Sequence, residues 1–175
     1  MVSLIYDLNS LLSYTSSSKL SILVESTLPF SYMYIEFSLA VLPLFHAFGL
    51  GVVVHFSMCA GFTVIGMPQF SPEKANKYMK KYNVTYIVGV PNMFKKMYEA
   101  SNFDGEHLKK LRLLWAGGDI ISETFLNSFN SKLDKWGAKG RLYRGYGLTE
   151  VSSVCTANVS GAYKENSIAK PLDGM

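Results

Sequence analysis

The chain has 175 residues, of which 49% are apolar and 17% charged, a balance that excludes a disordered chain and allows one domain with a real core. Its formal net charge of +4 comes from scattered lysines rather than a basic block, which gives slight support for an anionic ligand and poor support for nucleic acid as a partner. Cys59 and Cys155 lie far apart without a metal-binding spacing, so we expect a reducing, cytoplasmic setting rather than a disulfide framework.

The first regular elements are expected in a long apolar stretch. Between Glu36 and Glu73 there is no Asp, Glu, Lys or Arg. A proline and four glycines divide this stretch into short runs, which predict a buried strand over 39–45, an apolar helix over 46–60 and a strand over 62–67. The stretch also reaches the roughly 20 residues that cross a bilayer, so a small membrane protein is the less favoured alternative. We expect no stable membrane span.

A capped helix and a strand follow. Ser71 is a good N-cap and Pro72 suits the first helical position, so the sequence predicts a helix over 72–82. The run 84–90 is rich in β-branched residues and predicts a third strand. A second proline then starts a helix over 91–100 with apolar residues on one stripe.

Two further strands complete an alternating pattern. The strands are expected over 111–117 and 141–147, with a helix over 122–136 between them that Ser122 caps. Strands that alternate with helices of this length predict an α/β fold with a layered, mainly parallel sheet flanked by helices. The first 35 or so residues do not join this pattern.

Two glycine-bearing turns are expected at one edge of the sheet. "WAGGDI" (115–120) and "RGYGLTE" (144–150) both follow predicted strands, and ligands of parallel sheets collect beyond the carboxyl ends of strands. In the second turn Tyr146 offers a flat face for a purine, Thr149 a hydroxyl for a phosphate oxygen, and Glu150 a hard oxygen ligand for Mg²⁺. The alternative is a plain strand-to-helix turn with Thr149 as N-cap.

Four motifs occur in an order that resembles a known family. They are "LPLFHAFGL" (42–50), "LRLLWAGGDIIS" (111–122), "GYGLTE" (145–150) and "NSIAKPLDGM" (166–175). Together with the segment 70–100 they resemble the adenylate-forming (AMP-binding) superfamily, in a style closest to long-chain fatty acid–CoA ligases. The resemblance implies that 39–175 is a partial adenylation domain, part of the large domain of an AMP-binding synthetase, and that 1–38 is a poorly matched N-terminal segment.

The resemblance implies a role for each motif residue that binds nucleotide. Tyr146 would pack on adenine, Thr149 would contact the phosphate, and Glu150 would bind Mg²⁺, with the last two as the catalytic residues. The implied nucleotide-binding set is Gly117, Gly118, Asp119, Tyr146, Gly147 and Thr149.

The resemblance also implies a substrate pocket and a reaction. His46, from the "PLFH" motif, and Gly145 would border the pocket for the carboxylate; a lone histidine beside an apolar helix is otherwise more often a core residue. Arg144 is expected to be solvated. The family activates a carboxylic acid with ATP and Mg²⁺ as an acyl-adenylate, releases pyrophosphate and passes the acyl group to coenzyme A.

Parts of the family pattern do not match. "YTSSSKL" (14–20) has the hydroxyls and lysine of a phosphate loop but no glycine, and the family's hinge and C-terminal domain do not follow Met175. We therefore expect an internal fragment of an acyl-CoA synthetase, inactive or weak alone, so enzyme status stays open. Uncovered apolar sheet edges would favour association with other chains. A non-catalytic nucleotide-binding module is the alternative, and the acyl chain length is not fixed.

Overall fold

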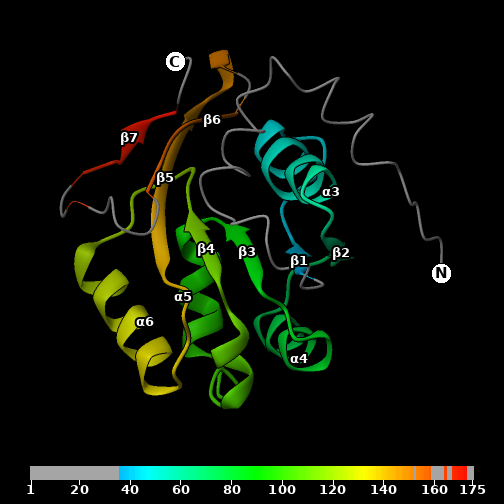
Figure 1. Cartoon of the computed structure of the whole chain (residues 1–175), viewed down its shortest axis with the longest axis vertical. Helices are drawn as coiled ribbons and strands as arrows, with labels where there is room; N and C mark the ends of the chain where they lie inside the picture. Colours follow the sequence, from blue (N-terminus) through cyan, green and yellow to red (C-terminus); the bar gives the residue numbers. More distant parts are fainter. Residues whose placement is uncertain (1–35, 152, 159–163, 165–166, 173–175) are drawn as a thin grey trace.

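The computed structural model describes residues 36–151, 153–158, 164 and 167–172 (Figure 1). Among them, seven strands form one sheet in the order β2-β1-β3-β4-β5-β6-β7. The strands are β1 (Phe37–Ala40), β2 (Thr63–Gly66), β3 (Tyr86–Gly89), β4 (Leu113–Ala116), β5 (Leu142–Leu148), β6 (Ser153–Ala157) and β7 (Lys170–Pro171). The pairs from β2 to β5 are parallel, whereas β5–β6 and β6–β7 are antiparallel. The predicted α/β fold with a mainly parallel sheet is confirmed.

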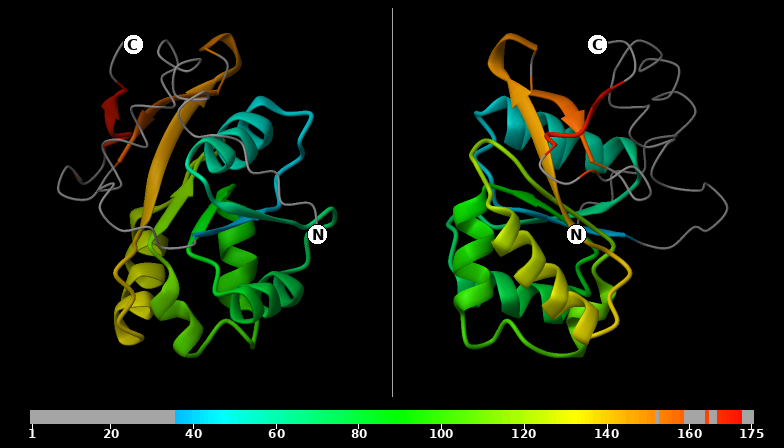
Figure 2. Two further views of the ribbon diagram at one scale, coloured as in Figure 1. Left: turned by 45° about the vertical axis from the view of Figure 1, so that its right-hand side comes forward. Right: turned by 90° about the vertical axis from the view of Figure 1, so that its left-hand side faces the viewer.

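Helices cover both faces of this sheet (Figures 1 and 2). The helical segments are the π-helix η1 (Phe48–His55), α3 (Phe56–Cys59), α4 (Pro72–Tyr82), α5 (Pro91–Glu99), α6 (Glu123–Lys135) and the 3₁₀ turns η2 (Glu106–Lys110) and η3 (Thr149–Val151). The helices η1 and α3 pack on one face and α4, α5 and α6 on the other. In β4, Leu114 and Ala116 face the second group while Trp115 faces the first, as the period of two residues requires.

The helix starts were the most accurate predictions. Helix α4 spans the predicted residues, and the Ser71 hydroxyl accepts a hydrogen bond from the Lys74 backbone N–H at 3.3 Å. Ser122 caps α6 in the same way, since its hydroxyl accepts from the Phe125 N–H at 3.2 Å. Each cap satisfies one of the N–H groups that a helix start leaves without an intrahelical partner.

Two predictions near the N-terminal end of the described chain need correction. The strand predicted over 39–45 ends at Ala40, because Pro43 has no N–H for the ladder and its carbonyl instead accepts from the His46 N–H at 3.2 Å in a turn. The predicted helix over 46–60 exists, but η1 is a π-helix, whose end is marked by the Phe56 N–H donating to the Gly51 carbonyl. The phosphate-loop candidate at 14–20 lies outside the described residues.

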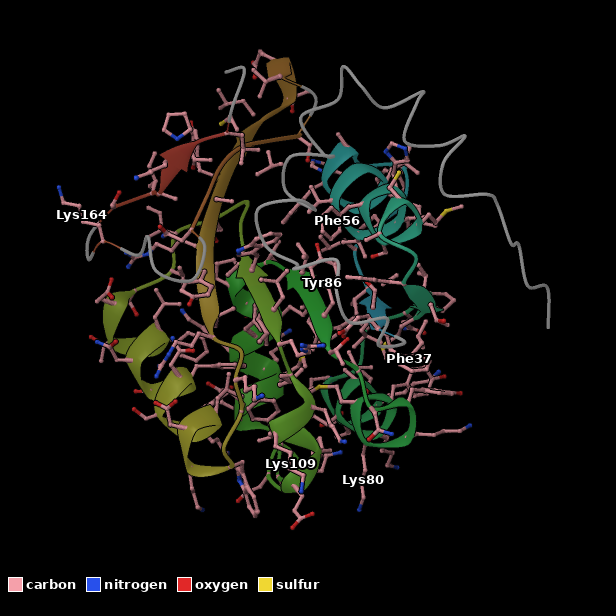
Figure 3. All side chains as sticks on the ribbon, viewed as in Figure 1. Phe37, Phe56, Lys80, Tyr86, Lys109 and Lys164 are labelled. Atoms are coloured by element: carbon pink, nitrogen blue, oxygen red, sulfur yellow. The ribbon has the colours of Figure 1, made fainter. Side chains whose placement is uncertain are left out.

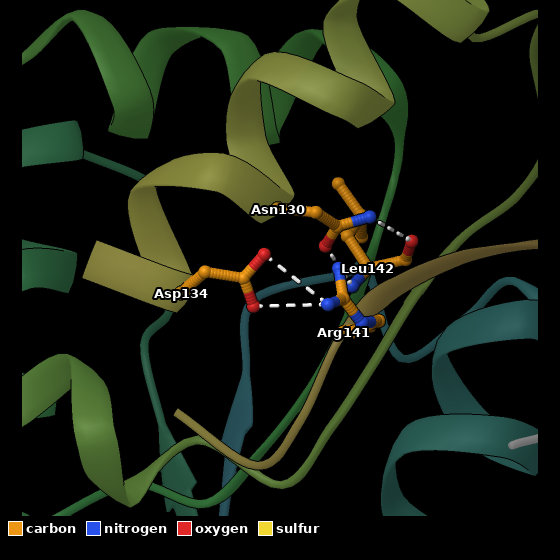
Figure 4. Close-up of polar contacts among 4 residues, drawn as sticks. All are labelled: Asn130, Asp134, Arg141 and Leu142. Carbon is orange, nitrogen blue, oxygen red and sulfur yellow. Dashed lines mark hydrogen bonds and ion pairs between the residues drawn. The ribbon is translucent and has the colours of Figure 1, made fainter. Parts of the chain in front are cut away.

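Polar contacts between α6 and β5 fix the start of the strand that carries the second glycine motif (Figure 4). The Asn130 side chain pairs with the backbone of Leu142, accepting from its N–H at 2.8 Å and donating to its carbonyl at 3.2 Å. Arg141 donates to both carboxylate oxygens of Asp134, at 3.0 and 3.1 Å. These contacts set the register of β5 relative to α6.

An aromatic cluster fills the space between β3, β4 and the helices η1 and α3. The rings of Phe56 and Tyr86 pack there with centroids 5.3 Å apart; both residues are labelled in Figure 3. The Tyr86 hydroxyl donates to the Val52 carbonyl at 3.1 Å, and burial raises the pKa of Tyr86 well above its ordinary value, so the hydroxyl keeps its proton. In the same view Lys80 and Lys109 lie at the opposite end of the molecule from the carboxyl ends of β3 and β4. The cluster therefore forms the apolar packing behind Trp115, a residue of β4 that both rings contact.

Candidate functional site

The two predicted glycine motifs meet at the carboxyl end of the sheet. A Cβ on Gly117 would lie 3.1 Å from the Gly145 carbonyl oxygen, so the turn after β4 touches the middle of β5. Gly118 has a φ of 82°, a conformation that L side chains rarely adopt, which lets the chain turn away from β4 at this point. The two segments thus form one edge, as the parallel topology predicts.

A cavity of about 230 Å³ lies where these segments face helix η1. Seven of the predicted site residues line it: His46, Gly117, Gly118, Gly145, Tyr146, Gly147 and Thr149. Its apolar wall is formed by Phe48, Val52, Val88, Trp115, Val154 and Ala157. A mostly apolar hollow with a few polar groups at its rim is the usual form of a site for a small organic ligand.

A second cavity, of about 490 Å³, lies across β5 from the first. It is lined by Ala116, Gly118, Asp119, Ile120, Ile121, Arg144, Gly145, Tyr146, Gly147, Ser167 and Ile168. Ala116 lines this cavity and Trp115 the first, and these neighbours on β4 point to opposite faces of the sheet. The segment 145–147 borders both cavities and so separates them.

His46 lies at the mouth of the first cavity and is exposed. Its Nδ1 accepts a hydrogen bond from the Phe48 backbone N–H at 3.1 Å. An Nδ1 that accepts a hydrogen bond carries no proton. In the neutral ring the proton is therefore on Nε2, which can donate a hydrogen bond to a ligand. The alternative interpretation of His46 as a buried core histidine is wrong, because the residue is exposed. One of its ring nitrogens is nevertheless hydrogen-bonded to the backbone.

Arg144 differs from its sequence prediction, because it is held by the protein rather than solvated. Its Nη2 lies 2.7 Å from Glu123 Oε2 and donates to the Ile121 carbonyl at 3.1 Å. The Arg144 and Glu123 side chains are only 14% and 19% exposed. This contact joins β5 to the start of α6 and to the turn that borders the second cavity.

Most of the second motif lies in β5, which confirms the strand predicted over 141–147, and the turn expected in this motif is confined to η3. Residues 145–148 belong to β5 and pair with β6, with an irregularity in register between Tyr146 and Gly147. A Cβ on Gly147 would lie 1.9 Å from the Ser153 carbonyl oxygen, so no larger residue fits there without a shift of backbone. The Tyr146 side chain is 40% exposed, and the Cys155 thiol donates to the Tyr146 carbonyl at 3.4 Å.

Three of the predicted site residues, Asp119, Thr149 and Glu150, are less closely grouped than the others. Asp119 borders the second cavity, and its own carboxylate accepts from the Ile120 N–H at 2.7 Å. Thr149 and Glu150 begin the short turn η3 and are exposed, and Glu150 lines neither of the two cavities. The alternative in which Thr149 caps a following α-helix is wrong, because β6 follows the turn.

The described part of the chain contains neither a metal-binding cluster nor a membrane-spanning helix. No group of three or more His, Cys, Asp or Glu side chains there is placed to hold a metal ion. None of its helices combines the length and apolar character that a bilayer crossing needs.

Sequence reasoning missed the apolar wall of the first cavity. Phe48, Val88 and Trp115 contribute to it from three different elements. Trp115 and Val88 are paired across β3 and β4, and both occupy the period-two position that faces η1. That period was visible in the sequence, but which face of the sheet holds a cavity depends on the packing of η1.

Comparison with known proteins identifies relatives of the chain. Residues 17–175 match the family model described as "AMP-binding enzyme". A probable 4-coumarate–CoA ligase 3 from Dictyostelium discoideum is 34% identical over 150 residues, which are 78% of this chain and 24% of that protein. A long-chain-fatty-acid–CoA ligase from Bacillus subtilis (strain 168) is 28% identical over 134 residues, or 76% of this chain and 23% of that protein. The chain thus spans about a quarter of the length of the curated relatives it matches.

Solved structures share the fold. Apo MatB from Rhodopseudomonas palustris superposes with a TM-score of 0.75 at 22% identity, covering 90% of this chain and 30% of that one. The O-succinylbenzoate coenzyme A synthetase MenE from Bacillus subtilis, solved in complex with ATP and a magnesium ion, gives a TM-score of 0.68 at 24% identity, covering 87% of this chain and 30% of that one.

Proposed function

The chain belongs to the AMP-binding enzyme family, and on that premise we propose that it forms the nucleotide and carboxylate-binding part of an ATP-dependent acyl-CoA synthetase. The observation that carries the proposal is the meeting of the "WAGGDI" and "GYGLTE" motifs and His46 around one cavity, with a second cavity on the other side of β5. The proposed reaction activates a carboxylic acid, such as a fatty acid, as an acyl-adenylate and transfers the acyl group to coenzyme A.

The two cavities suit the two halves of an acyl-adenylate. We assign the apolar first cavity, bordered by His46 and Gly145, to the carboxylic acid. The second cavity, bordered by Gly118, Asp119 and Tyr146, is assigned to the adenine. The segment 145–147 then lies between the two groups, where the carboxylate and the α-phosphate must come together.

The chain's own groups position and neutralise rather than react covalently. The His46 Nε2–H can donate a hydrogen bond to an oxygen of the carboxylate substrate at the cavity mouth. Tyr146 supplies a flat face for the purine and Thr149 a hydroxyl for a phosphate oxygen. Glu150 supplies a carboxylate of the kind that Mg²⁺ prefers, and its exposure leaves it accessible to an ion that arrives with the nucleotide. Bound Mg²⁺ would offset the negative charge of the phosphates.

Several further predictions belong to this proposal. ATP, Mg²⁺ and coenzyme A are its cofactors and co-substrates; the presence of ATP and magnesium in the MenE structure supports the first two. The division into a segment 1–38 and a partial adenylation domain 39–175 is retained. A cytoplasmic location is supported by two free thiols, Cys59 and Cys155. Association through apolar surface is supported by Phe45, which is 95% exposed.

The proposal is tested by calorimetric titration of the purified 175-residue chain with AMP and with a non-hydrolysable acyl-adenylate mimic. Replacing Tyr146 with Ala should weaken binding of either ligand by about 5- to 150-fold, because stacking of a base on an aromatic ring contributes roughly 1–3 kcal/mol. Tyr78→Ala is the matched control, since Tyr78 packs against Tyr82 on α4, away from both cavities.

The outcomes of this titration separate the possible functions. Absence of heat for both ligands at millimolar concentration would refute nucleotide binding. Equal affinity of the Tyr146→Ala and Tyr78→Ala variants would refute the assigned position of the adenine. Pyrophosphate release from ATP, Mg²⁺ and a carboxylic acid at ordinary enzyme rates would contradict the expectation that this chain is inactive or weak alone.

A further inference from the structure

Trp115 is the largest buried side chain that lines the first cavity, so we take it as the inner end of that cavity. This residue lies in β4, paired with Val88 of β3 on one side and Tyr143 of β5 on the other. Its side chain is buried and lines the cavity together with Val52 and Val88. Because all of these residues belong to central strands or to the helix above them, the inner end of the cavity is built by the described chain itself.

The Trp115 ring is held in place from several directions. Its Nε1–H donates to the Asn158 carbonyl at 2.8 Å. The ring meets Tyr86 edge to face, with centroids 6.2 Å apart and an interplanar angle of 87°, and it meets Phe56 in a similar way at 6.4 Å. Tyr86 is itself anchored through its hydroxyl to Val52. A ligand cannot push the indole aside without breaking a buried hydrogen bond and displacing two other buried rings.

The volume in front of Trp115 is small. An apolar cavity of about 150 Å³ is large enough to bind benzene, so a cavity of about 230 Å³ has room for about eight or nine carbon atoms. A saturated chain of about eight carbons, or a single ring with a short side chain, fills such a space. A longer acid would have to leave part of its chain outside the apolar wall.

We infer that Trp115 limits the acyl group to a compact carboxylic acid, so that the substrate is a short-chain or single-ring acid rather than a long-chain fatty acid. This inference rests on the proposed function, because it takes the first cavity to be the carboxylate site. Trp115 acts as a specificity-determining residue. It contacts the far end of the acyl group and takes no part in the chemistry at the carboxylate.

The test is a chain-length series on the purified 175-residue chain. Saturated acids from butanoate to dodecanoate are titrated by calorimetry below the concentrations at which they form micelles. Burying one methylene strengthens binding about fourfold, so Kd should fall by that factor per carbon up to about eight carbons and then level off. The carbon number at which Kd levels off is the quantity to compare between variants.

Two variants should move this carbon number in opposite directions. Trp115→Leu removes about six non-hydrogen atoms from the inner end of the cavity. It should raise the carbon number at which Kd levels off by about two to four, because the surrounding side chains fill only part of the space. Ala157→Val narrows the same cavity and should move it about one or two carbons shorter. Trp136→Phe is the control for loss of a tryptophan, since Trp136 follows α6 on the other face of the sheet and should leave the carbon number unchanged.

Each outcome decides the inference. A Kd that continues to fall up to dodecanoate in the unchanged chain, or the same carbon number in Trp115→Leu and the unchanged chain, would overturn the role of Trp115. If Trp115→Leu does not fold by circular dichroism, an unmoved value in Ala157→Val would overturn it. Failure of every acid to bind would overturn the proposed carboxylate site and this inference together, whereas binding without the expected length dependence overturns the inference alone.

Discussion

Replacing Arg144 with Met should destabilise the protein substantially, because the contact with Glu123 is largely shielded from water. Loss of one partner of a fully buried ion pair costs about 3–5 kcal/mol, and loss of an exposed pair costs less than about 1 kcal/mol. With side chains 14% and 19% exposed, this pair lies near the buried limit, so we expect a loss of about 2–3 kcal/mol. For a chain of this size the loss lowers Tm by roughly 4–12 °C.

The measurement is urea unfolding at pH 7 followed by far-UV circular dichroism, with thermal unfolding beside it. Arg141→Met is the matched control, since Arg141 lies on the same segment but pairs with Asp134 in the open, with side chains 47% and 50% exposed. It should lose less than about 1 kcal/mol. Equal losses in the two variants would refute the claim that shielding from water makes the Arg144 contact strong. A cycle with Glu123→Gln isolates the pairwise contribution.

Two further predictions concern backbone fit and pH. Gly147→Ala should prevent β5 and β6 from pairing and abolish ligand binding, because the added Cβ would lie 1.9 Å from the Ser153 carbonyl oxygen. Gly145→Ala is the control, since the nearest atom to its added Cβ would be 3.7 Å away. This control variant should keep the far-UV spectrum of the unchanged chain. Burial and then the charge of Lys80 lower the pKa of His107 below the ordinary value of 6.5, so the unfolded chain binds this proton more readily. The free energy of unfolding that His107 contributes above pH 6.5 should therefore decline as the pH falls below that value. His107→Gln should reduce the difference in Tm between pH 7.5 and pH 5.5. An unchanged difference would contradict this role of His107.

The helices and the parallel part of the sheet could be predicted because their causes are local. Ser71 and Ser122 cap helices through contacts within three residues, and proline at the first helical position acts on its own turn. The antiparallel strands β6 and β7 could not be predicted in this way. The segment 153–157 has no strong alternation, and it pairs because Gly147 leaves room for a second backbone beside β5.

The candidate site was predictable in its glycines and less so in its side chains. Two glycine turns after parallel strands must come to the same edge, so their meeting follows from topology alone. The burial of Arg144 depends on Glu123, which lies 21 positions earlier and meets it only after α6 has packed on β5. Whether an arginine is solvated or held is decided by such distant partners, which a motif does not contain.

The segment 145–147 has a consequence for how its two sides communicate. It borders both cavities and carries one side chain between two glycines. A change in its backbone therefore alters the lining of both cavities at once, so a single substitution in this segment should disturb the binding of both proposed ligands.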